Sequence, residues 1–131
     1  MSPARSALVL AGLMASAGIA HFVAPRKFDS IVPRSLPGSP RLWTAASGVA
    51  ELTLAAGLVL PATRRASARA TALFFAGVFP ANAKMAYDWR YRSTIARAIA
   101  YGRLPLQVPL ILWARHAGRE NVRRGAVGVD R

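Results

Sequence analysis

Residues 77–88, GVFPANAKMAYD, place a proline, an amide and an ammonium group at the end of an apolar segment. The preceding residues are mostly alanine, phenylalanine and small polar side chains, so we predict one membrane-spanning helix over 66–87. Pro80 has no backbone N–H and frees the carbonyl of Ala76. We therefore expect a kink at Pro80 that turns Asn82 and Lys84 toward the interior of the protein.

The composition of the chain indicates a membrane protein. Its 131 residues suffice for one domain, and 53% of them are hydrophobic while only 18% are charged. The chain has no cysteine, which excludes disulfides, thiol redox relays and metal sites built on thiolates. Any redox role would therefore need a bound cofactor.

The charge of the chain is strongly positive, with 18 Lys and Arg against 5 Asp and Glu and a net charge of +13. Such an excess is typical of nucleic-acid-binding proteins. Here, however, the basic residues form short clusters between apolar runs, as loops beside an anionic bilayer do. We expect the lipid bilayer as a partner, and no nucleic acid.

Four segments approach the roughly 20 apolar residues needed to cross a hydrocarbon core about 30 Å thick. The first also resembles a secretory signal peptide, with Arg5 before it and small residues at 15–17, but three hydrophobic segments follow it. The short turn 61–65 predicts an antiparallel hairpin. We predict an all-α, polytopic membrane protein, an antiparallel four-helix bundle over residues 1–117, with transmembrane helices at about 6–23, 41–60, 66–87 and 93–115.

The remaining segments are expected to lie outside the bilayer. Residues 28–41 contain three prolines and a glycine, so we predict an irregular loop that caps one end of the bundle. Residues 118–131 are polar, and we expect a flexible cytoplasmic tail. The distribution of Lys and Arg slightly favours both termini in the cytoplasm.

The predicted bundle brings polar side chains from all four helices into one half of the bilayer. Glu51 and Arg103 fall at similar depth, where an ionised side chain costs about 2.5–3.5 kcal/mol unless it is partnered, so we expect them to pair. Such a pair would either fix the helix register or form part of a ligand site. The expected buried polar cluster comprises His21, Glu51, Asn82, Lys84, Arg103 and Gln107.

This cluster lacks the residue sets of common enzymes. It has no pair of carboxylates for acid and base catalysis and no Ser, His and Asp set. The two histidines, His21 and His116, are predicted at opposite ends of the bundle, so we expect no metal site. We expect no enzymatic activity from the chain on its own.

Four motifs together resemble the DoxX-like small membrane proteins of bacteria. They are GIAHFVAPRKFDSIVPRSLP at 18–37, SGVAELTLAAGLVLPATRR at 47–65, FPANAKMAYD at 79–88 and RLPLQ at 103–107. The resemblance implies a multi-pass protein of the bacterial cytoplasmic membrane. The family takes its name from a subunit of a membrane thiosulfate:quinone oxidoreductase, and some relatives are partners of redox enzymes. It therefore implies an accessory or anchoring subunit of a membrane redox or envelope complex, with protein partners.

Two alternatives remain open. In one, the polar cluster binds a quinone or lipid-like small molecule, and the chain is a quinone-linked redox subunit with quinone as its cofactor. In the other, the chain is a small transporter or membrane assembly factor, with Glu51 as the group that takes up and releases protons. The small residues on the predicted helices also permit a homo-oligomer.

Overall fold

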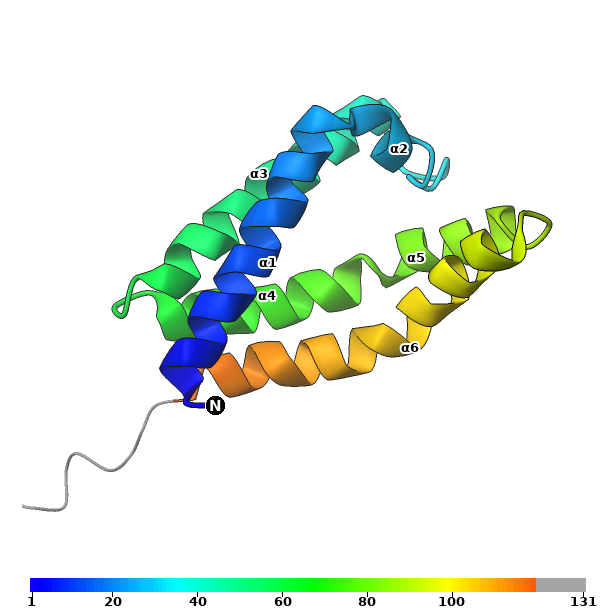
Figure 1. The fold of residues 1–131 in the computed structure, drawn as a ribbon. Helices are drawn as coiled ribbons and strands as arrows, with labels where there is room; N and C mark the ends of the chain where they lie inside the picture. The colour runs from blue at the N-terminus through cyan, green and yellow to red at the C-terminus, as the bar shows by residue number, and fades with distance from the viewer. Residues whose placement is uncertain (120–131) are drawn as a thin grey trace, which may run out of the picture.

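The computed structural model describes residues 1–119, and every regular element in that range is an α-helix. The predicted all-α class is therefore confirmed. The predicted tail lies outside the described residues from 120 onward. The helices are α1 (Pro3–Val23), α2 (Pro25–Asp29), α3 (Pro40–Val59), α4 (Arg64–Gly77), α5 (Phe79–Asp88) and α6 (Thr94–Ala117), as Figure 1 shows.

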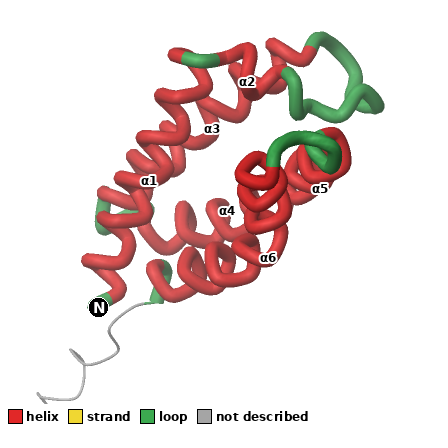
Figure 2. Tube along the Cα trace, turned by 45° about the vertical axis from the view of Figure 1, so that its right-hand side comes forward, coloured by secondary structure: helices red, strands yellow, loops and turns green. Residues whose placement is uncertain are grey.

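The helices form two groups that meet at one end and diverge at the other (Figures 1 and 2). Helix α1 packs on α3, while α6 packs on α4 and α5. The groups join where the N-terminus lies beside the end of α6, and there the Trp113 indole N–H donates to the Ser6 hydroxyl at 2.7 Å. The opposite end, which carries α2 and α5, is called the open end below.

The segment expected as one kinked helix over 66–87 is instead two helices. The Val78 amide donates to the Phe74 carbonyl at 3.0 Å, which completes α4. Pro80 then lies in the first turn of α5, where a missing N–H removes no hydrogen bond within the helix. The proline thus starts a helix rather than bending one, and Asn82 belongs to a segment with its own direction.

The segment between α1 and α3 is only partly irregular. Residues 25–29 form the short helix α2, and turns follow it. Ser39 caps α3 by accepting a hydrogen bond from the Leu42 amide, and the Trp43 indole donates to the Pro37 carbonyl at 2.6 Å. Arg41 binds Asp29 across the loop at 2.9 Å. These contacts fix the loop at the open end.

The predicted fourth helix corresponds to α6, which continues through both of its prolines. Pro105 lies near its middle and cannot donate to the carbonyl one turn earlier, which weakens the helix there. The two halves of α6 run in different directions in Figure 1. The N-terminal half follows α5 and the C-terminal half follows α4.

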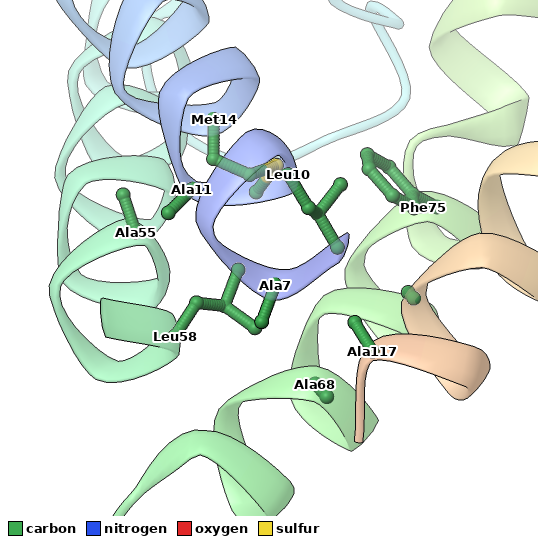
Figure 3. Close-up of a cluster of buried hydrophobic side chains, with 10 residues drawn as sticks. Ala7, Leu10, Ala11, Met14, Ala55, Leu58, Ala68, Phe75 and Ala117 are labelled. Atoms are coloured by element: carbon green, nitrogen blue, oxygen red, sulfur yellow. The ribbon is translucent and has the colours of Figure 1, made fainter. Parts of the chain in front are cut away.

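The apolar core lies at the closed end, where Leu10 and Met14 of α1 meet Leu58 of α3 and Phe75 of α4 (Figure 3). Small side chains dominate the rest of this cluster and allow close approach of the helices. They are Ala7, Ala11, Ala55, Ala68, Ala114 and Ala117.

Helices α1 and α3 approach closely at Gly48. A Cβ added there would lie 2.7 Å from the Phe22 ring and 2.9 Å from the Cβ of His21. Real Cβ atoms essentially never come under 3.0 Å, so this contact requires glycine. The close approach brings His21 beside Glu51, one helical turn beyond Gly48 on α3.

Many large apolar side chains lie on the surface of the molecule. Large apolar side chains such as Leu73 and Ile95 are about three-quarters exposed. By length and composition, α1 and α3 are each apolar enough to cross a membrane. The buried polar side chains are Ser6, Thr44, Glu51, Thr71, Asn82 and Gln107.

Candidate functional site

A pocket of about 100 Å³ lies at the open end, between the two helix groups. Four of the predicted site residues line it: His21 from α1, Glu51 from α3, Asn82 from α5 and Arg103 from α6. Asn82 is only 3% exposed, so its amide is held inside the protein at the wall of this pocket. The structure therefore brings together polar groups that lie up to 82 positions apart in the chain.

His21 and Glu51 form the closest charged contact in the pocket. The His21 Nδ1 lies 3.0 Å from the Glu51 Oε2, and each side chain is about a tenth exposed. The same Nδ1 lies 2.8 Å from the Ala17 carbonyl, an acceptor, so this nitrogen carries the proton and donates it to Ala17. The Phe28 ring stacks on the imidazole with 3.8 Å between ring centroids, which fixes the orientation of His21.

The Glu51 carboxylate therefore has a near neighbour but no hydrogen bond directed at its Oε2. The Thr44 hydroxyl, on the same face of α3 and two turns earlier, is also buried without a well-formed hydrogen bond, although it faces Asp29. A buried polar atom without a partner costs about 1–3 kcal/mol. Because both residues line the pocket, it presents unused hydrogen-bonding capacity to whatever occupies it.

The ion pair expected between Glu51 and Arg103 does not form. Arg103 lines the pocket but is not within ion-pair distance of Glu51, whose partner is His21. The glycine contact holds α1 against α3, whereas α6 diverges from α3 at the open end. Both residues line one pocket, but similar depth along their helices does not fix the distance between them.

Two predicted cluster residues lie outside the pocket. The Lys84 ammonium binds the Asp88 carboxylate one turn later and donates to the Ser30 carbonyl at 3.2 Å. It therefore ties α5 to the loop and does not point at Glu51. Gln107 is buried, and its Oε1 has no hydrogen-bond partner, but it lies one turn deeper along α6 than Arg103.

The sequence interpretation missed most of the other residues that line the pocket, Phe28, Trp43 and Thr44 among them. Thr44 had a usable signal, because it precedes Glu51 by seven residues and so shares its helix face. Phe28 and Trp43 had none, since their positions depend on how the loop between α1 and α3 folds.

The polar side chains of the pocket can form hydrogen bonds with a ligand. The Asn82 amide, the Thr44 and Ser47 hydroxyls and the Arg103 guanidinium can donate them, and the Glu51 carboxylate can accept them. Within residues 1–119, no three histidine or acidic side chains gather in a way that could hold a metal ion.

The fold and the pocket define a class: an all-helical protein with many exposed apolar side chains and a small pocket between its helices that polar and apolar side chains line together. The chain belongs to the family described as Domain of unknown function (DUF8561), whose model matches residues 10–118. The matched region contains every residue that lines the pocket. No curated protein and no solved structure matches the chain.

Proposed function

We propose that the chain is a multi-pass protein of the bacterial cytoplasmic membrane with four spans. The spans are α1, α3, α4 together with α5, and α6, and both termini face the cytoplasm. The exposed apolar side chains of α1, α3, α4 and α6 support this arrangement, because they would otherwise face water. Burial of the charged and amide side chains of Glu51, Asn82 and Gln107 supports it as well.

We further propose that the pocket binds the polar headgroup of a lipid-soluble molecule of the quinone class. The observation that carries this proposal is the buried Glu51 carboxylate, which lines the pocket without a hydrogen bond to its Oε2. A quinone carbonyl accepts hydrogen bonds from Asn82, Thr44 or Arg103, and a quinol hydroxyl donates to Glu51. The aromatic rings of Phe28, Trp43 and Phe74 provide apolar walls for a ring.

The size of the pocket limits what it encloses. Its volume of about 100 Å³ is below the roughly 300–1,000 Å³ of pockets that bury whole drug-sized ligands. It therefore recognises part of a headgroup, while an apolar tail remains outside among the lipids. In this reading the chain is an accessory subunit that holds the ligand for a redox or envelope complex, as its resemblance to DoxX-like proteins also suggests.

A fluorescence titration tests this proposal. Purified protein in neutral lipid nanodiscs is titrated with decylubiquinone, which quenches tryptophan emission. Because Trp43 lines the pocket, we expect saturable quenching that Trp43→Phe largely removes. Glu51→Gln and Thr44→Val each remove a ligand contact worth about 1 kcal/mol, so each should weaken binding about fivefold.

Thr53→Val is the matched control, because Thr53 lies on α3 outside the pocket and its hydroxyl bonds only the Val49 carbonyl of its own helix. It should leave the affinity unchanged. Quenching that does not saturate, or that is the same in the Glu51→Gln and Thr53→Val proteins, contradicts a quinone site in this pocket.

A further inference from the structure

A second, larger pocket of about 550 Å³ lies at the open end, between α2 on one side and α5 and α6 on the other. It shares Phe28, Ile31 and Arg103 with the first pocket but contains neither His21 nor Glu51. Its remaining lining comes from α2, from the start of the loop, from α5 and α6, and from the turn between these two helices. The proposed quinone site makes no use of most of these residues.

The charged side chains that line this second pocket are all positive. Arg26 and Lys27 of α2 face Arg92 and Arg103 across it, and no acidic side chain lines it. None of these four cations forms an ion pair with a residue in the part of the chain that the structure describes. Arg92 makes one stacking contact, with its guanidinium carbon 4.6 Å from the centre of the Trp89 ring.

Of the three acidic residues at this end, Glu51 lines the first pocket, and the other two are engaged by cations outside the second pocket. Asp29 is bound by Arg41 at 2.9 Å, and Asp88 is bound by Lys84. Both carboxylates are thereby held by cations outside the pocket. Four cationic side chains therefore line a cavity that no acidic side chain lines, and this favours an anionic ligand.

The other walls of the pocket are apolar. Ile31, Met85 and Ile99 line it together with the Trp89 ring, and Ile99 is about half exposed at its edge. A small inorganic anion would leave these walls without a partner, whereas an amphiphile would contact both kinds of surface. Tryptophan and basic side chains are typical of the depth at which lipid headgroups lie.

We propose that this second pocket binds the phosphate headgroup of an anionic phospholipid. The phosphate lies among Arg26, Lys27, Arg92 and Arg103, and one acyl chain runs along Ile31, Met85 and Ile99. The inference rests on the proposed membrane location, which supplies the lipid, and the site shares Arg103 with the proposed quinone site but not Arg26, Lys27 or Arg92. Free phosphate shares the chemistry of the headgroup but cannot use the apolar walls.

The test compares two lipids that have the same acyl chains and a phosphate but differ in the group on the phosphate and so in net charge. Purified protein in a neutral detergent is titrated with dioctanoyl phosphatidylglycerol and with dioctanoyl phosphatidylcholine, and bound lipid is counted by native mass spectrometry. We expect one tight site for the anionic lipid. The Lys27→Gln, Arg92→Gln double variant should weaken it about 25-fold, or roughly fivefold for each cation removed.

Arg97→Gln is the control, because Arg97 is an exposed cation near the same end of α6 that does not line the pocket. Its affinity should stay within about twofold of the unchanged protein, since its charge lies outside the site. Equal binding of the two lipids overturns the proposal, and so does an Arg97→Gln loss as large as that of the double variant. Displacement of the lipid by millimolar inorganic phosphate at constant ionic strength overturns the lipid assignment in favour of the soluble anion.

Two further measurements keep the proposals separate. Thermal unfolding followed by circular dichroism shows whether the double variant is folded. Because Lys27 and Arg92 are both exposed, we expect an unchanged melting temperature. Decylubiquinone titration of the same variant should be unaffected, because Lys27 and Arg92 do not line the first pocket. Loss of lipid binding with normal quinone binding supports the second site specifically.

Discussion

Asp29 and Arg41 form a contact on which the position of the loop depends. The Arg41 Nε and Nη2 both lie 2.9 Å from the same carboxylate oxygen, so the pair joins the end of α2 to the start of α3. The hydrogen bond from Arg41, and to a lesser degree the nearby Thr44 hydroxyl, lowers the pKa of Asp29 below its ordinary value. The charged form of Asp29 is therefore the form that stabilises the loop.

This lowered pKa predicts an acid-sensitive loop. A depressed carboxyl pKa contributes stability that is present above the ordinary value of about 3.9 and is lost as the pH falls through the lower, folded-state pKa. We expect the emission of Trp43, whose indole bonds the loop at Pro37, to change in that acidic range. Arg41→Gln should move this change to higher pH, toward the ordinary value.

Arg34→Gln serves as the control for this titration, because Arg34 lies in the same loop but makes no ion pair with a residue of the described range. It should titrate like the unchanged protein. A transition that Arg41→Gln leaves in place would show that another group controls the loop.

At the scale of elements, three of the four predicted helices agree with α1, α3 and α6 to within a few residues, because long apolar runs and capping residues such as Ser39 mark them clearly. The predicted helix over 66–87 does not agree with the structure, because a proline is compatible both with a kink and with the first turn of a new helix. Local sequence does not distinguish a kink from a new helix. The packing of α5 on α6 favours the new helix. The sequence could place His21, Glu51 and Arg103 at one end of the molecule, since α1, α3 and α6 set their depth, whereas the position of Asn82 depends on α5.

A substitution at Gly48 tests the close packing of α1 on α3, which places His21 beside Glu51 in the first pocket. Gly48→Ala forces its new methyl group against Phe22 and His21, and overpacking of this kind typically costs about 1–3 kcal/mol. We expect lower stability and a separation of His21 from Glu51. The measurement is thermal unfolding in detergent, followed by circular dichroism.

The same substitution at Gly12 is the control, because a Cβ there meets no atom within 4 Å. Alanine is favoured over glycine inside a helix by about 0.5–1 kcal/mol, so Gly12→Ala should be neutral or stabilising. If both substitutions shift the melting temperature alike, the close approach of α1 and α3 is not what Gly48 provides.

At the scale of the whole molecule, the arrangement of its ends predicts a topology. The N-terminus and the turn between α3 and α4 lie at the closed end, while the loop after α2 and the turn after α5 lie at the open end (Figure 1). A membrane crossed by all the helices would separate these two ends. The predicted orientation places the closed end in the cytoplasm.

Single-cysteine labelling checks this topology, and the absence of native cysteine makes each introduced thiol unique. Intact cells are treated with a membrane-impermeant maleimide. We expect Ser35→Cys and Tyr91→Cys to be labelled from outside, while Ser2→Cys and Ala62→Cys react only after the membrane is opened, because the bilayer blocks the reagent. The reverse pattern would invert the orientation, and labelling of all four in intact cells would contradict a four-span protein.

The hydrogen bond from Lys84 to the Ser30 carbonyl also bears on how molecules exchange with the interior. Among the described residues it is the only hydrogen bond that crosses the open end, where Ile31 adds apolar packing against Met85 and Ala86. The closed end is held by the larger apolar cluster. Thermal motion therefore separates α5 from the loop before it disturbs the closed end. For the proposed quinone site, this local opening would set the residence time of the ligand, and its passage between lipid and pocket would require no unfolding of the bundle.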